Sequence, residues 1–266
     1  GPGSAPDRIV VNIAVTEQST GEYGATAGYS TVDGILGEVS LTERNFLGRG
    51  QYLRAAIGAS QSGRTFDFSF TEPRFMGLKV ATGVDVYHRI SDENSSSVYG
   101  SEATGGQFRA GMPLTSSLSV TLFSGMERKV IKDADTPTSV LVNDGKEFYK
   151  GFVGYTLTWN GVDNLKSPTE GLYATFTQQY IGWDHNLIRS EARARYFIPV
   201  LQDTGIVASL RGQAGVLNDL SGNGVHTVEA FVPGSQLIRG FENTAQKLFE
   251  AGEIGEIRQW RSAYLQ

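Results

Sequence analysis

Four charged side chains occupy every second position of one short segment. They are Arg189, Glu191, Arg193 and Arg195, and the residues between them are small. A period of two places all four charges on one face of a β-strand, whereas a helical spacing would scatter them around a cylinder. The segment does not supply the paired carboxylates of acid–base catalysis. The stripe instead predicts a strand face that lines water, such as the wall of a lumen.

Residue types that support catalysis or metal binding are otherwise sparse. The chain has no cysteine, which excludes a thiol nucleophile and a disulfide framework. Its three histidines, His88, His185 and His226, lack a metal-ligand spacing. Neither a Gly-x-Ser-x-Gly elbow nor a phosphate-binding loop occurs, and Gly105-Gly106 falls within an expected strand, where it eases a bend or close packing. We therefore expect no enzymatic activity, no catalytic residue, no metal and no cofactor.

The charged stripe belongs to a long series of alternating segments. Three phenylalanines alternate with polar residues between Thr65 and Thr71, and a similar alternation runs from Gly205 to Val216. Such patterns predict an all-β protein built from antiparallel strands. Eleven strands are expected, near residues 22–30, 34–43, 51–60, 64–72, 79–90, 103–112, 117–130, 148–159, 171–181, 187–198 and 205–217.

The connectors between these strands alternate in length. One set is compact and punctuated by Pro or Gly, as in residues 45–50 and 73–77, whereas the other set contains long polar segments at 91–101, 132–146 and 218–244. Short turns on one rim and long loops on the other are typical of transmembrane β-barrels. A soluble sandwich would not need this asymmetry.

Composition agrees with a barrel and limits the partners. The 33 Gly, 14 Phe and 11 Tyr suit turns and aromatic-rich strands. A net charge of −5 argues against a nucleic-acid partner. No segment approaches the roughly 20 apolar residues of a transmembrane helix, but barrel strands alternate and need no such segment.

Several motifs give the chain a family resemblance. Residues from about 20 to 241 resemble the outer-membrane assembly barrels of the bacterial surface-antigen superfamily. The motifs that carry the resemblance, in chain order, are the segments Gly28 to Gly34, Leu41 to Gln51, Phe70 to Phe75, Ser167 to Gly171 and Leu237 to Phe241.

The resemblance assigns Arg239, Gly240 and Phe241 to the signature loop of the family, which folds back into the lumen. There Gly240 would permit close backbone approach, and Phe241 would wedge against the wall. A buried Arg239 must have an acidic partner, because an unpaired buried charge is strongly destabilising. Glu191 is the candidate in this sequence. The alternative is an exposed Arg239 on a flexible loop.

The resemblance also implies a function and a location. The parent protein would assemble and insert β-barrel proteins into the outer membrane of a Gram-negative bacterium. Its partners would be unfolded outer-membrane proteins, the lipoproteins of the assembly complex and outer-membrane lipids. Two alternatives stay open: a secretion or translocation pore of the same superfamily, and a passive porin or adhesin barrel.

The expected organisation has four parts. Residues 1–4 resemble a tag remnant, and residues 5–19 resemble the end of the last periplasmic POTRA domain with its linker. Residues 20–244 form the barrel portion, with about eleven strands readable of the sixteen that the family barrels have. Residues 245–266 form an atypical tail whose apolar residues fall nearer helical spacing.

Overall fold

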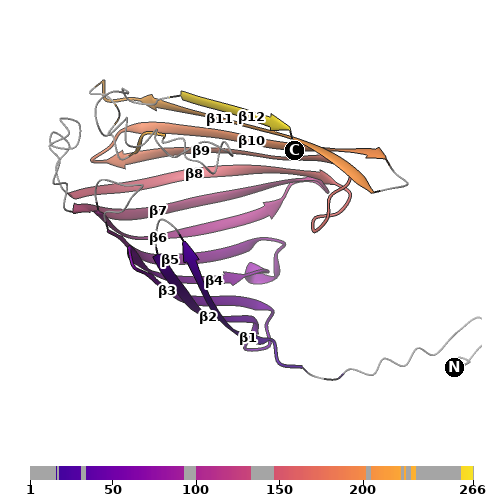
Figure 1. Cartoon of the computed structure of the whole chain (residues 1–266), viewed down its shortest axis with the longest axis horizontal. Coiled ribbons are helices and arrows are strands. Elements are labelled where there is room, and N and C mark those ends of the chain that lie inside the picture. The colour runs from indigo at the N-terminus through magenta and orange to yellow at the C-terminus, as the bar shows by residue number, and fades with distance from the viewer. Residues whose placement is uncertain are drawn as a thin grey trace, which may run out of the picture.

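The computed structural model describes residues 16, 18–30, 34–92, 100–132, 147–201, 205–222, 225, 229–231 and 259–265. These residues form one sheet of twelve antiparallel strands that follow one another in chain order. Figure 1 shows the sheet curling along its width, so that β1 to β5 lie below β6 to β12. The strands are β1 (Gly21–Ser30), β2 (Gly34–Phe46), β3 (Gln51–Ser60), β4 (Gly63–Glu72), β5 (Ala81–Ser91), β6 (Gly100–Pro113), β7 (Leu118–Lys132), β8 (Glu147–Val162), β9 (Gly171–Trp183), β10 (Leu187–Leu201), β11 (Ile206–Asp219) and β12 (Gln259–Leu265).

All eleven predicted strands are confirmed, with ends that differ by a few residues. The compact connector expected between β4 and β5 contains a short 3-10 helix, η1 (Phe75–Gly77), which the turn residues do not predict. Within the described residues there is no helix with the length and apolarity needed to cross a membrane.

The expectation of a helical tail was wrong for residues 259–265. They form β12, which pairs antiparallel with β11 from Leu210↔Leu265 to Val216↔Gln259. The edge of β11 that does not pair with β10 offers backbone donors and acceptors to β12. These hydrogen bonds override the weak helical spacing of the apolar residues in this segment. The remainder of the tail lies outside the described residues.

The outer face of the sheet carries large apolar side chains on every strand from β1 to β11. Many of them are exposed, with exposed fractions of 61% at Met126 and 67% at Val39. A continuous exposed apolar surface of this kind needs an apolar surrounding, because water would drive it to aggregate. Its members include Tyr23, Val39, Ile57, Phe66, Phe68, Val84, Val86, Phe108, Leu122, Met126, Val153, Tyr180, Tyr196 and Leu210.

The inner, concave face is polar over much of its width. The strand registers place its residues at the positions that alternate with the outer set. Its charged members on β2 to β8 include Glu38, Arg54, Asp67, Asp85, Arg89, Arg109, Glu127 and Lys150. Apolar-out and polar-in alternation is the arrangement of a transmembrane barrel wall.

The compact turns are held by side chains that accept backbone hydrogen bonds. In the turn after β2, Asn45 Oδ1 accepts from the Gly50 N–H at 2.6 Å, and Gly50 has a φ of 67° that favours glycine. In the turn after β8, Asp163 Oδ1 accepts from the N–H groups of Thr169 at 2.9 Å and Glu170 at 3.1 Å. These bonds, together with one from the Thr169 hydroxyl, hold the pKa of Asp163 well below its usual range.

Candidate functional site

Ion pairs between neighbouring strands line the inner face. Each joins a basic side chain to a carboxylate on the adjacent strand, at 2.7 Å for Arg54 to Glu38 and 2.8 Å for Arg89 to Asp67. The pairs are partly exposed, so each stabilises the fold by little. Together they pair opposite charges on a wall whose other face is apolar.

The pair between Arg109 and Asp85 forms the centre of a larger network. Arg109 Nε donates to Asp85 Oδ2 at 2.9 Å, and its Nη2 donates to the Thr71 hydroxyl at 2.6 Å. To reach β4 from β6, the guanidinium lies across Gly83 of β5, where a Cβ would come within 2.7 Å of Arg109 Cζ. The glycine therefore lets one side chain connect three strands.

A second network centres on Lys150 of β8. Its Nζ lies 3.0 Å from Glu127 Oε1 on β7 and 2.8 Å from Glu229 Oε1, which belongs to the segment after β11. Glu229 is only 4% exposed. The Tyr87 hydroxyl also donates to Glu127, and it reaches from β5 to β7 across Gly105 of β6.

The same segment after β11 buries an aromatic ring against the inner wall. Phe231 is 5% exposed and belongs to an apolar cluster with Ile181, Leu187, Leu217 and Val225. The Arg189 guanidinium lies 4.6 Å from the centre of the Phe231 ring, within range of a cation–π interaction. The described residues of the long loop therefore contact β8 to β11 on their inner face.

The four predicted lumen-facing charges lie on the face of β10 that also carries the buried Leu187 and Phe197. Arg189 Nε donates to Glu191 Oε1 at 2.7 Å, and Arg193 Nη2 donates to Glu191 Oε2 at 3.2 Å. Arg195 donates to Ser209 at 3.3 Å. Glu191 thus already has two guanidinium partners on its own strand. That these charges line water stays a prediction.

The predicted signature residues Arg239, Gly240 and Phe241 lie outside the described residues, so the pairing of Arg239 with Glu191 stays a prediction. Sequence reasoning missed Lys150, Tyr87 and Glu229. The first two stand at inward positions of alternating strands, which a closer reading of the period could have identified. No sequence signal links Glu229 to Lys150, because it lies in a loop.

The histidines do not gather into a site. His88 lies on the outer face, with its Nδ1 2.7 Å from the Thr104 hydroxyl, and the buried His185 stacks on Phe148 at 5.9 Å between ring centres. His226 is outside the described part of the chain. Within that part, no group of three or more His, Cys, Asp or Glu side chains is arranged to hold a metal.

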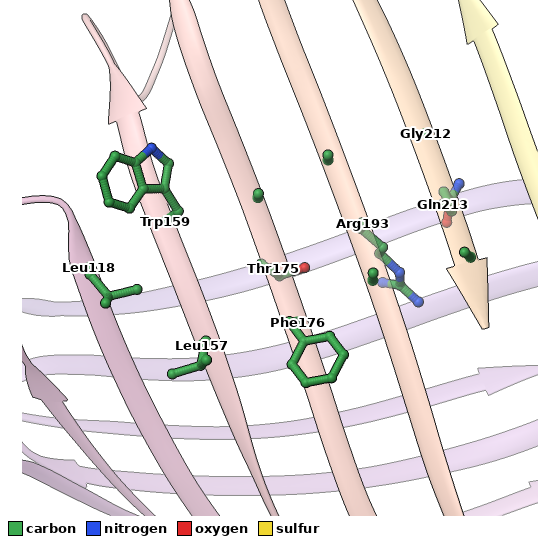
Figure 2. A pocket seen from close by; sticks show the side chains of 12 residues that line it. Leu118, Leu157, Trp159, Thr175, Phe176, Arg193, Gly212 and Gln213 are labelled. Atoms are coloured by element: carbon green, nitrogen blue, oxygen red, sulfur yellow. The ribbon is translucent and has the colours of Figure 1, made fainter. Parts of the chain in front are cut away.

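The outer face includes a shallow apolar groove of about 480 Å³ near the turn after β8. Figure 2 shows Trp159 and Phe176 on neighbouring strands at its side, with Gly212 further along the wall. Alanines on β9 to β11 form much of its floor. This groove belongs to the apolar face and brings no reactive group together.

The chain is similar to proteins of one family. The Omp85 superfamily domain matches residues 45–248. The chain is 28% identical over 186 residues to the outer membrane protein assembly factor BamA of Neisseria meningitidis, covering 62% of this chain and 23% of that protein. It is 25% identical over 249 residues to the BamA of Nitratidesulfovibrio vulgaris, covering 91% of this chain and 31% of that protein.

A solved structure shares the fold. The crystal structure of Haemophilus ducreyi BamA lacking POTRA domains 1–3 aligns with a TM-score of 0.73 at 20% identity, over 85% of this chain and 46% of that one. The chain thus spans less than a third of the curated relatives. The family match covers most of the chain, from the compact turn after β2 to residue 248. The chain belongs to the Omp85 superfamily, and it has the β-barrel fold of a BamA-like protein of the bacterial outer membrane.

Proposed function

We propose that this chain forms part of the barrel of a factor that folds and inserts β-barrel proteins into the outer membrane. The observation that carries the proposal is its similarity to two proteins named as outer membrane protein assembly factors, over 62% and 91% of its length. We assign the full activity to a longer parent protein, because both relatives are much longer than this chain.

The first strand supports the proposal. Among the described strands, β1 pairs with β2 alone, so the backbone N–H and C=O groups on its other edge have no partner strand there. Lipid cannot satisfy such groups, and an extended chain that pairs with them gains a full ladder of hydrogen bonds. The strand also contains Gly21, Gly24 and Gly28, which place no side chain in the way of a neighbour. This edge would template the strands of a substrate.

The outer face supplies the second element. Its apolar side chains hold the sheet in the bilayer, while a sheet edge in the same membrane disturbs lipid packing nearby. Insertion would then need neither a cofactor nor an energy source. The expected partners are unfolded outer-membrane proteins, the lipoproteins of the assembly complex and outer-membrane lipids, and no enzymatic step is involved.

Two proline substitutions on β1 test the role of its edge. Successive residues of a strand direct their N–H groups to opposite sides. Of Thr26→Pro and Ala27→Pro, one therefore removes a donor to β2 and the other removes a donor of the free edge.

Both variants of the full-length parent would be compared in the folding of an unrelated outer-membrane barrel in liposomes. We expect the variant with unchanged thermal stability, which has lost the free-edge donor, to accelerate substrate folding less than the unsubstituted parent. Full acceleration by that variant would show that the edge is not the template.

A further inference from the structure

We propose that Lys150 is the wall residue that anchors the long loop after β11 inside the barrel, through Glu229. The inference deepens the proposed function and rests on it for the loop's part in assembly. Lys150 lies on β8, near the end of the strand from which the long loops leave, and its Nζ is 2.8 Å from Glu229 Oε1. The two residues are 79 positions apart in the chain. Their contact is thus a tertiary connection between loop and wall.

The charge balance makes Lys150 necessary for this contact. Its ammonium lies between two carboxylates, Glu127 at 3.0 Å and Glu229 at 2.8 Å. Glu127 belongs to the wall and has a second donor in Tyr87. Glu229 is almost fully buried, and among the described residues Lys150 is the side chain that donates to its carboxylate. Without Lys150, two carboxylates would face each other in a buried place, which is strongly unfavourable.

Lys129 provides an internal comparison. It lies on the same face of β7 as Glu127, two residues further along, and it interacts with Glu229 through space. Its removal would change the net charge of the cluster by the same amount as removal of Lys150. It makes no hydrogen bond to Glu229 in the described structure. The two lysines therefore separate a direct anchor from a general effect of charge.

The Lys150–Glu229 ion pair and the packing of Phe231 contribute differently to the position of the loop. Phe231 lies two residues after Glu229 and packs against Leu187 and Leu217, which supplies attraction without fixing direction. The hydrogen-bonded ion pair supplies the direction, because its geometry tolerates little displacement. Ten positions separate Glu229 from Arg239 in the sequence.

Thiol labelling tests the anchor in the full-length parent, reconstituted in liposomes in a cysteine-free form. Val225→Cys places a thiol in the apolar cluster, where the native side chain is 4% exposed. The rate of its reaction with a water-soluble maleimide reports release of the loop from the wall. Glu229→Ala is the principal variant, because it leaves the Lys150 to Glu127 pair of the wall intact. Lys150→Met is the reciprocal variant, and Lys129→Met is the matched control.

We expect Glu229→Ala and Lys150→Met each to raise the labelling rate by about tenfold or more, the factor that corresponds to loss of one charge-assisted hydrogen bond. Lys129→Met should change the rate by less than about threefold. The shift of the folded band in electrophoresis identifies any variant that fails to fold. If Lys150→Met does not fold, Glu229→Ala decides the matter alone.

Equal labelling of the Glu229→Ala variant and the unsubstituted barrel would overturn the proposal, as would equal acceleration by Lys129→Met and Lys150→Met. The labelling readout does not depend on assembly activity. A parent protein that shows the predicted labelling but does not accelerate substrate folding would keep the anchor and refute the proposed function.

Discussion

Gly105 provides a sharp test of how the inner wall is packed. It lies on β6 opposite Tyr87 of β5, and the tyrosine crosses it to reach Glu127 on β7. A Cβ at Gly105 would lie 2.6 Å from the Tyr87 hydroxyl oxygen, 2.7 Å from Tyr87 Cζ and 2.9 Å from the backbone oxygen of Met126. Gly105→Ala must therefore push the ring away from Glu127.

The expected loss follows from two opposing effects. A hydrogen bond to a carboxylate contributes about 1.5–3 kcal/mol, and its loss destabilises the fold by that amount. Replacement of a strand glycine by alanine returns about 0.5–1 kcal/mol, because the unfolded chain loses freedom. The free energy of unfolding should therefore fall by about 0.5–2.5 kcal/mol.

Urea unfolding of the parent barrel in lipid vesicles measures this change. Gly106→Ala is the matched control, because its Cβ would lie on the outer face, 3.2 Å from the Asp85 backbone oxygen and 3.7 Å from Val86 Cγ2. Tyr87→Phe should destabilise the native barrel but add nothing in the Gly105→Ala background. Equal stability of the Gly105 and Gly106 variants, or additive effects of Gly105→Ala and Tyr87→Phe, would refute the reasoning.

Three further predictions address the outer face, the docked segment and a turn. Met126→Arg should destabilise the barrel by about 2–4 kcal/mol in vesicle unfolding, whereas Thr121→Arg on the inner face of the same strand should have little effect; equal effects would contradict the assignment of faces. Phe231→Ala should speed thermolysin cleavage of the loop in the folded parent, and an unchanged rate would contradict its packing in the apolar cluster. The pKa of Asp163 is lowered in the fold by its bonds to Thr169, so its contribution to stability is complete above its ordinary pKa of 3.8 and is lost as the pH falls through the folded pKa. The destabilisation by Asp163→Asn, measured by unfolding from about pH 6 to about pH 2, should therefore shrink at the acid end, and a constant difference would show that the charge is irrelevant.

The strands could be predicted because each one alternates between residues suited to lipid and residues suited to the polar inner face. Phe66 and Phe68 alternate with Asp67 and Ser69, since lipid-facing and inward positions succeed one another with a period of two. β12 could not be predicted in this way. Its place depends on the free edge of β11, and an edge selects a partner through backbone groups that carry no residue identity.

The inner site was predictable only in part. The stripe on β10 is visible in the sequence, since its members share one strand and one face. The contact of Lys150 with Glu229 joins a strand to a distant loop, and the crossing of Gly105 by Tyr87 joins strands that are not neighbours. Such contacts depend on the curvature of the sheet and on glycines that leave room for a neighbouring side chain. The alternation of residues along a strand predicts neither.

The most direct test of the assembly function is the folding rate of an unrelated outer-membrane β-barrel in liposomes, with and without the full-length parent protein. The proposed function predicts that the parent accelerates folding of this substrate and that Arg239→Ala reduces the acceleration. An unchanged folding rate, together with steady ion conductance through the parent, would contradict assembly and would identify a pore.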